Sequence, residues 1–66
     1  MNNLHELKMA VTLEHQIILT LYNGDTISGL PKWGEDPKRV KLRTVEGAVW
    51  VPLEEIEHVT RIIPLI

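Results

Sequence analysis

The chain has 66 residues, no cysteine and a formal net charge of −2. A single domain of this size lies near the lower limit for folding alone, and its core rarely supplies more than ~3–5 kcal/mol of net stability. Without cysteine, disulfides and thiolate metal ligands are excluded. We therefore expect association between copies of the chain to supply additional stability. No apolar stretch approaches the ~18 residues of a membrane span, and no secretory signal pattern is present, so we expect a cytoplasmic protein without a membrane partner.

The charge is unevenly distributed along the chain. Residues 32–43 contain five basic and two acidic residues, a local charge of +3, while the rest of the chain carries −5. Non-specific binding of nucleic acid by the whole surface is therefore not expected. Binding of an anion or a nucleic acid is expected only at a local basic patch.

The first predicted element is a short amphipathic helix. Leu4, Leu7 and Val11 recur at helical spacing. The alternative is a strand over residues 9–13, where β-branched residues fall. The choice between helix and strand stays open for residues 4–13.

A β-hairpin is predicted around the Asn23-Gly24 turn, with its first strand over residues 16–21, where apolar and polar residues alternate. A two-residue loop places Ile27 opposite Thr20, whereas a three-residue loop with a left-handed glycine places it opposite Leu19. We prefer the three-residue loop because it collects the large apolar residues on one face.

The second strand is expected to bend at Gly29, where no side chain stands in the way. A loop over residues 31–37 follows, as the prolines and glycine there indicate. The bend predicts a strongly curved sheet.

A second hairpin is predicted from a strand over residues 39–45, a two-residue Glu46-Gly47 turn and a strand over residues 48–51. This turn pairs Leu42 with Val51 on the inside and Arg43 with Trp50 on the outside. Pro52 then ends the ladder because it lacks an amide donor. A tight helical turn over residues 53–56 and a short fifth strand over residues 57–63 complete the pattern.

The predicted fold is mainly β, a small five-stranded antiparallel SH3-like barrel with a short N-terminal helix. The single domain, residues 1–66, divides into a helix and lead-in (1–15), the barrel (16–63) and an apolar tail (64–66). Alternation in each strand predicts the apolar residues inside the barrel. They are Ile17, Leu19, Leu21, Ile27, Val40, Leu42, Val49, Val51, Ile56 and Val59.

The first hairpin also carries a family pattern: an alternating strand, Asn-Gly, three residues, then Gly. Its residues here are Leu19, Leu21, Asn23, Gly24, Ile27 and Gly29. With the strand, tight turn and closing strand of residues 49–59, the chain resembles the Sm-like branch of the SH3-like barrels over residues 16–63. The resemblance implies RNA binding or, as in the Sm-like inhibitors of the transcription terminator Rho, which share the hairpin and an acidic surface, protein binding.

The RNA-binding residues of Sm proteins are not matched. In place of their Asp and Asn after the second strand, this chain has residues 33–37 (WGEDP), without Asn. In place of their Arg-Gly or Lys-His pair before the last strand, it has Leu53-Glu54-Glu55. The uridine pocket of the family is therefore not carried over to this chain.

A candidate partner-binding surface lies on the outward face of the third and fourth strands and the adjoining loop. Basic side chains bind phosphate and an indole stacks on a base, as in platforms for single strands. The alternatives are contact with a protein and plain packing, in which the stem of Arg43 covers Trp50 as a cation–π pair. The candidate residues are Lys32, Trp33, Arg39, Lys41, Arg43 and Trp50.

Catalytic chemistry has no support in the sequence. His5, His15 and His58 share no metal-ligand spacing, and Ser28, the single serine, lies in a strand without a nucleophile elbow. Glu54, Glu55 and Glu57 are interpreted as a solvated acidic turn rather than as paired catalytic carboxylates. We expect no enzyme, no metal site and no cofactor.

The apolar C-terminal tail predicts a homo-oligomer interface, because exposure of several large apolar side chains to water is unfavourable and a second copy can bury them. Its residues are Ile62, Ile63, Leu65 and Ile66. The sequence thus favours a non-enzymatic regulatory module that binds a protein and associates with itself. The alternatives are an Sm-like module for RNA or single-stranded nucleic acid, and a small-ligand binder at a subunit interface.

Overall fold

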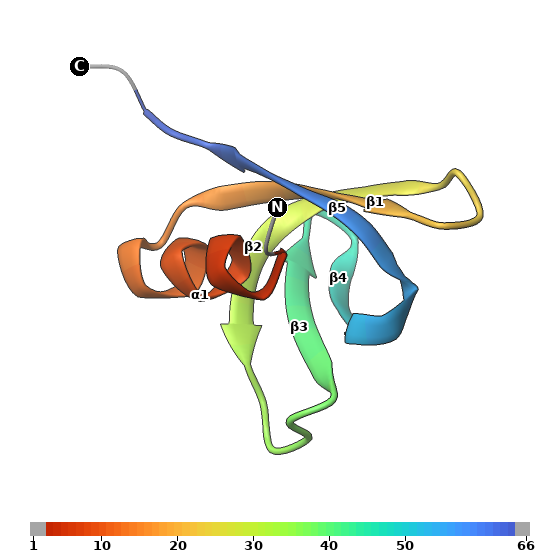
Figure 1. Cartoon of the computed structure of the whole chain (residues 1–66). Helices are drawn as coiled ribbons and strands as arrows, with labels where there is room; N and C mark the ends of the chain where they lie inside the picture. The colour runs from red at the N-terminus through yellow and green to blue at the C-terminus, as the bar shows by residue number, and fades with distance from the viewer. Residues whose placement is uncertain (1–2, 65–66) are drawn as a thin grey trace.

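The computed structural model describes residues 3–64, which form one helix, five antiparallel strands and one short 3-10 turn (Figure 1). The elements in chain order are α1 (Asn3–Leu13), β1 (Gln16–Leu21), β2 (Thr26–Trp33), β3 (Arg39–Thr44), β4 (Gly47–Pro52), η1 (Leu53–Glu55) and β5 (Ile56–Ile62). The predicted mainly β fold with an N-terminal helix is confirmed. No helix within residues 3–64 is long and apolar enough to cross a membrane.

The five strands form one sheet in the order β4-β3-β2-β1-β5. β2 takes part in two ladders, because it pairs with β1 as far as Gly29 and with β3 from Leu30 onward. The bend between these halves folds the sheet over, with β1 and β5 in one layer and β3 and β4 in another (Figure 1). The sheet is curved like the predicted barrel but is not closed, since β4 and β5 are its edges.

Gly29 is buried at this bend because β3 passes directly over it. A Cβ atom at this position would lie 2.4 Å from the carbonyl oxygen of Arg43 and 3.0 Å from Cγ of Leu42. No side chain fits there without moving β2 away from β3. The close approach of the two backbones explains why glycine occupies the bend.

The N-terminal segment is a helix, which decides the alternative that the sequence leaves open. Leu7 and Ala10 are almost completely buried in the core, and α1 packs against β5 and β2. The helix ends at Glu14, which has a positive φ of 57°, and the amide of His15 donates to the carbonyl oxygen of Ala10. A residue with a positive φ at the end of a helix is usually glycine, because glycine has no Cβ atom to clash in this conformation.

The helix is also tied to the last strand by two polar contacts. Asn3 Nδ2 donates to the carbonyl oxygen of Glu57 at 2.8 Å. Arg61 Nε donates to Glu6 Oε2 at 2.6 Å, and both side chains of this ion pair are largely covered. The first and last elements of the fold therefore hold each other.

The first hairpin has the predicted register, with Leu19 opposite Ile27. Gly24 is the left-handed residue of the three-residue loop, with φ +94°, and its amide donates to the carbonyl oxygen of Leu21. Asn23 supports the loop, since its Oδ1 accepts from the amide of Asp25 at 2.9 Å. The three-residue loop is confirmed.

The turn of the second hairpin lies one residue earlier than predicted. Val45 and Glu46 form the loop, and Gly47, predicted in the turn, pairs with Thr44 at the end of the ladder. Thr44 Oγ1 donates to the carbonyl oxygen of Gly47 at 2.8 Å and accepts from the amide of Glu46 at 3.1 Å. Both hydrogen bonds of this hydroxyl stabilise the turn in its observed position.

The predicted pairing of Leu42 with Val51 is consequently wrong. Leu42 lies opposite Val49, and Val51 lies opposite Val40. Because the register shifts by two residues, each side chain keeps its predicted face. Inward and outward positions on β3 and β4 are therefore as predicted, while their cross-strand neighbours are not.

The loop predicted over residues 31–37 is too long, because Pro31 and the two residues after it belong to β2. Pairing with β1 has ended at Gly29, so this part of β2 has a neighbouring strand on one side only. Proline is tolerated at such edge positions, where an amide donor is not needed. The predicted fifth strand (57–63) begins and ends one residue earlier.

Eight of the ten predicted core residues are buried, and α1 adds Leu7 and Ala10 to them. Ile27 is only partly buried and packs against the core. Val49 is 38 % exposed, which corrects the prediction. It faces inward but lies on edge strand β4, where no further strand covers it.

Candidate interaction surface

The outer face of β2, β3 and β4 gathers most of the predicted partner-binding residues. On β3, Val40 and Leu42 are buried, so the basic residues between and beside them face outward. The cross-strand register then places Lys32 of β2 opposite Lys41 of β3, and Lys41 opposite Trp50 of β4. One row of side chains thus runs across three strands, from a lysine through a second lysine to an indole.

The predicted neighbours Arg43 and Trp50 do not pair, because the turn lies one residue earlier than expected. Arg43 lies opposite Ala48, and Lys41 takes its place opposite the indole. Lys41 Nζ lies 5.6 Å from the centroid of the Trp50 ring. The cation–π contact therefore involves Lys41, at a distance where such contacts contribute about 0.5–1 kcal/mol on a surface.

Trp50 keeps 51 % of its surface exposed although it touches Lys41. Its ring reaches toward the loop after β2, since a Cβ atom on Gly34 would lie 3.8 Å from Nε1 of Trp50. A half-exposed indole beside Lys41, with Lys32 next in the row, can bind an apolar or planar group together with an anion.

Trp33 does not belong to this face. It lies opposite Val40 and thus on the inward side of β2, and it is 39 % exposed. It lines a groove of about 410 Å³ along the end of β2 together with Val11 of α1 and Glu14, which follows the helix. Lys32 and Arg43 of the outer face also line this groove. Trp33 therefore lies on the other side of β2 from the row of Lys32, Lys41 and Trp50, but it shares a groove with Lys32 and Arg43.

Arg39 lies on the outer face, but its charge is used locally. Arg39 Nε donates to Asp36 Oδ2 at 3.0 Å, and the amide of Lys38 donates to Asp36 Oδ1 at 2.9 Å. The hydrogen bond from the Lys38 amide, followed by that from Arg39, lowers the pKa of the Asp36 carboxyl below its ordinary value of 3.8. This arrangement fixes the start of β3.

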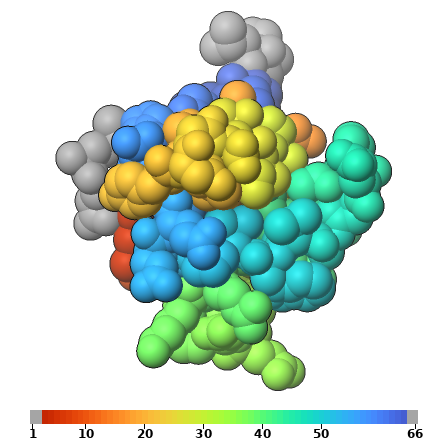
Figure 2. Space-filling model, turned by 90° about the vertical axis from the view of Figure 1, so that its right-hand side faces the viewer, coloured from red at the N-terminus to blue at the C-terminus, as the bar shows by residue number. Residues whose placement is uncertain are grey.

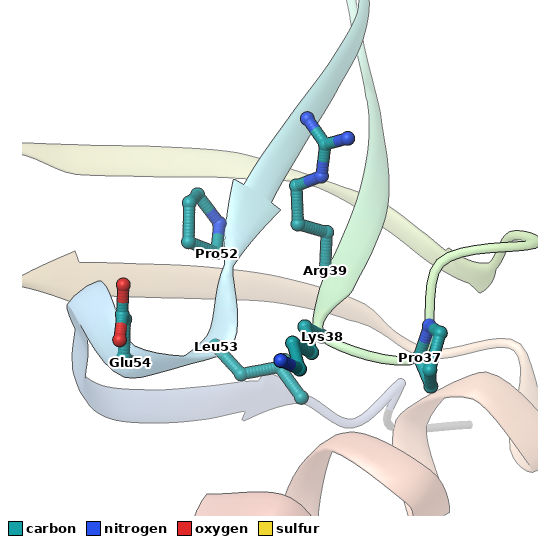
Figure 3. Close-up of a pocket in the computed structure, with 6 residues that line it drawn as sticks. All are labelled: Pro37, Lys38, Arg39, Pro52, Leu53 and Glu54. Atoms are coloured by element: carbon teal, nitrogen blue, oxygen red, sulfur yellow. The ribbon is translucent and has the colours of Figure 1, made fainter.

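A depression of about 420 Å³ lies where the outer face meets η1 (Figure 3). Arg39 and Pro52, which are cross-strand partners, form one wall, and Leu53 and Glu54 of η1 form another (Figure 3). Sequence reasoning did not identify this depression, because it depends on how η1 folds back after the proline.

A smaller apolar pocket of about 180 Å³ lies between the start of α1, η1 and β5. Leu4, Leu53 and Val59 are among its lining residues. Helical spacing indicated that Leu4 and Leu7 share one face of the helix, but it did not indicate that a pocket remains between this face, η1 and β5.

The acidic turn lies on the surface, and Glu54, Glu55 and Glu57 are all exposed. Within residues 3–64, no group of three or more histidine, aspartate or glutamate side chains is arranged to hold a metal ion. Nδ1 of His15 is buried and has no hydrogen-bond partner among the described residues.

Two of the four residues predicted for the oligomer interface are among the described residues. Ile62 is 46 % and Ile63 55 % exposed at the end of β5, which is an edge strand. Leu65 and Ile66 lie outside the described residues.

Comparisons of the chain with protein-family models, with curated proteins and with solved structures found no match.

Proposed function

We propose that the chain is a non-enzymatic regulatory module that acts by protein–protein interaction and associates with itself. The observation that carries this proposal is the exposure of edge strand β4. Four consecutive residues of this strand, residues 47–50, are exposed, and its sequence, GAVWVP, contains no charge. Val49 and Trp50 place apolar surface on both sides of the strand.

An exposed, uncharged edge strand is a template for pairing with another chain. Soluble proteins usually protect such an edge with lysine, proline or a bulge. Here Pro52 protects only the end of β4. Within residues 3–64, the backbone groups before it have β3 on one side and no strand on the other. Burial of this edge by a partner strand provides both main-chain hydrogen bonds and apolar contact.

The opposite edge of the sheet offers a second contact. β5 ends in Ile62, and Ile63 follows it, and both side chains are about half exposed. β5 also carries charged residues such as Glu57 and Arg61, which makes its edge less permissive than that of β4. We therefore expect β4 to supply the main contact and the C-terminal isoleucines to contribute to it.

Sedimentation of the wild-type chain tests the proposal, and we expect a mass above that of one copy. Val49→Lys places a charge on the apolar side of β4 and is expected to abolish this association. Val45→Lys is the matched control, because Val45 is fully exposed in the turn outside the ladder and its change should leave the mass unaltered. A wild-type chain that sediments as one copy, or equal loss in both variants, contradicts the proposal.

Binding of single-stranded nucleic acid is the second candidate, and the row of Lys32, Lys41 and Trp50 is the observation that favours it. In that case Arg43→Ala should lower affinity for an oligonucleotide and flatten its salt dependence. Contact of Trp50 with a protein should instead respond to Trp50→Ala and vary little with salt. Tyr22→Ala, an exposed aromatic residue of the first hairpin, is the control.

A small ligand at a subunit interface is the third candidate, and the open depressions on the surface would then be completed by a second copy. Membership of the Sm-like barrels belongs to the same proposal, with which the five-stranded order and the N-terminal helix are compatible. A cytoplasmic location is likewise proposed.

A further inference from the structure

We propose that two copies of the chain dock through the outer face of the β3–β4 hairpin. The basic cluster of each copy, which is Lys32, Lys41 and Arg43, then faces the acidic turn of the other, which is Glu54 and Glu55 on η1. The inference rests on the proposed self-association and names a surface that orients the copies.

No ion pair of the described residues includes a member of the basic cluster, although Glu14 lines a groove with Lys32 and Arg43. Lys32 and Lys41 are direct cross-strand partners, and like charges in that arrangement are destabilising. Arg43 follows two residues later on the same face of β3. Within residues 3–64 the ion pairs are Arg39–Asp36 and Arg61–Glu6, and neither includes a member of the cluster. An arrangement that weakens the isolated fold is explained by an anionic group that binds there.

Glu54 of the acidic turn lies at the opposite end of the same face, and Glu55 follows it toward the first hairpin, where both line a depression with Tyr22. η1 follows β4 directly, and Glu54 lines the same depression as Arg39 and Pro52, the last pair of the outer face (Figure 3). In the space-filling view, η1 lies beside β4, with the loop before β3 below them and the first hairpin above (Figure 2). Glu54 and Glu55 are exposed and form no ion pair among the described residues.

The charge of the outer face therefore changes from positive at the basic cluster to negative at the acidic turn. Residues two apart on a strand are separated by about 7 Å, so the cluster and the turn lie roughly 15–20 Å apart. A two-fold axis through the middle of such a strip turns the second copy end for end and brings each basic cluster over the acidic turn of the other copy. The dimer then contains two equivalent contacts, and in each of them a basic cluster faces the acidic turn of the other copy.

The ion pairs alone would hold the copies weakly, because exposed pairs contribute little each. Trp50 lies in the row of the basic cluster and is half exposed, so its indole is covered when the faces meet. A buried tryptophan is a common centre of an interface, where the contacts that surround it keep water out. The second copy thus supplies both the charge and the apolar contact that this face lacks.

Charge reversal tests the pairing directly. Lys41→Glu/Arg43→Glu reverses two of the three charges of the basic cluster, and Glu54→Lys/Glu55→Lys reverses both charges of the acidic turn. We expect each variant to raise the dissociation constant of the homodimer about tenfold or more. An equimolar mixture of the two variants should form a heterodimer at least as stable as the wild type. The wild-type dimer should also weaken as salt increases.

Lys8→Glu, a reversal on the exposed side of α1, is the control and should leave association unchanged. Circular dichroism and thermal melting establish that each variant is folded. The inference is overturned if the mixture remains as dissociated as its components, or if wild-type association is absent or independent of salt. It is also overturned if Lys41→Glu/Arg43→Glu abolishes binding of a single-stranded oligothymidylate but leaves association unchanged, which would assign the cluster to nucleic acid.

The outcome separates this inference from the proposed use of the β4 edge. If Val49→Lys loses association and the charge-reversed variants associate normally, the copies pair through the β4 edge and not through the charged face. Association that responds to charge reversal but not to Val49→Lys supports the charged strip alone.

Discussion

The two hairpins each contain a glycine with a positive φ, but the glycine has a different role in each. Gly24, with φ +94°, is the last residue of a three-residue loop. Gly47, with φ +123°, is the first residue of β4 and pairs with Thr44. The same dipeptide signal, a polar residue followed by glycine, thus forms the last two residues of the first loop, whereas in the second hairpin it spans the last loop residue and the first residue of the next strand.

The comparison shows what alternation of apolar residues can determine. A slip of one residue moves every side chain to the other face, and in the first hairpin this excluded the two-residue loop. A slip of two residues leaves every face unchanged. Leu42 faces inward whether it pairs with Val49 or Val51, so the second register depends on a hydrogen bond of the Thr44 hydroxyl.

The strands of the two hairpins also differ in how many neighbours they have. β1 lies between β2 and β5, and Ile17 and Leu19 are fully buried. β4 is an edge, and Val49 is more than a third exposed despite its inward position. The same spacing of apolar residues therefore has a different energetic value in a central strand and in an edge strand.

The largest expected effect follows from that difference. Leu19→Ala should lower the free energy of unfolding by about 2–5 kcal/mol, because it leaves a cavity in a closed part of the core. Val49→Ala should lower it by less than about 1 kcal/mol, because the site is already open. Urea unfolding at low protein concentration measures both, and equal losses would show that β4 is packed as tightly as β1.

The second effect concerns the point where β2 leaves one hairpin and joins the other. Gly29→Ala should destabilise the fold by roughly 1–3 kcal/mol, because its Cβ would overlap the Arg43 carbonyl oxygen. Gly34→Ala is the control, since its Cβ would meet Nε1 of Trp50 at 3.8 Å, an ordinary contact. Its change in unfolding free energy should stay within about 0.5 kcal/mol. Similar results for the two variants would remove the steric explanation of the bend.

The third effect tests what places the second turn. Thr44→Val removes the hydroxyl that bonds Gly47 and Glu46, and should lower the free energy of unfolding by about 0.5–1.5 kcal/mol. Cross-strand NMR contacts report the register, and we expect some of the population to pair Arg43 with Trp50 in place of Lys41. Thr26→Val, an exposed threonine of the first hairpin, should leave its own register unchanged.

The smallest effect concerns Asp36, at the other end of the second hairpin. Its carboxyl should titrate below 3.8 in NMR, because the Lys38 amide and Arg39 bind the charged form. A carboxyl with a lowered folded-state pKa contributes stability that is fully present above the unfolded pKa and is lost as the pH falls through the folded value. Asp36→Asn should therefore flatten the stability curve below about pH 4, and an unchanged curve would contradict this assignment.

The sequence predicted most of the fold because alternation and turn residues act locally. The strand limits of residues 16–21, the three-residue loop and the outward direction of Lys41 and Arg43 all follow from patterns a few residues long. The sequence left a helix and a strand as alternatives for residues 4–13, because the stability of the helix depends on burial of Leu7 and Ala10 against strands distant in the sequence.

The candidate site was predicted less completely, because it depends on which strands are neighbours. Pairing of Lys41 with Trp50 required the register of the second turn, and the exclusion of Trp33 required β2 to extend past Pro31. The depression beside Glu54 required the position of η1 relative to β3. None of these follows from spacing along the chain.

The contacts between α1 and β5 also bear on how the chain folds. Asn3 reaches Glu57 and Glu6 reaches Arg61, so these contacts close loops of 54 and 55 residues, almost the whole chain. Because long loops must close before such contacts contribute, they are expected to form late in folding. The helix should then be the last element to dock and the first to exchange its amide hydrogens, while β1 and β2 remain protected. A protein of this design would sample a helix-undocked state, with Leu7 and its pocket exposed, well before it unfolds.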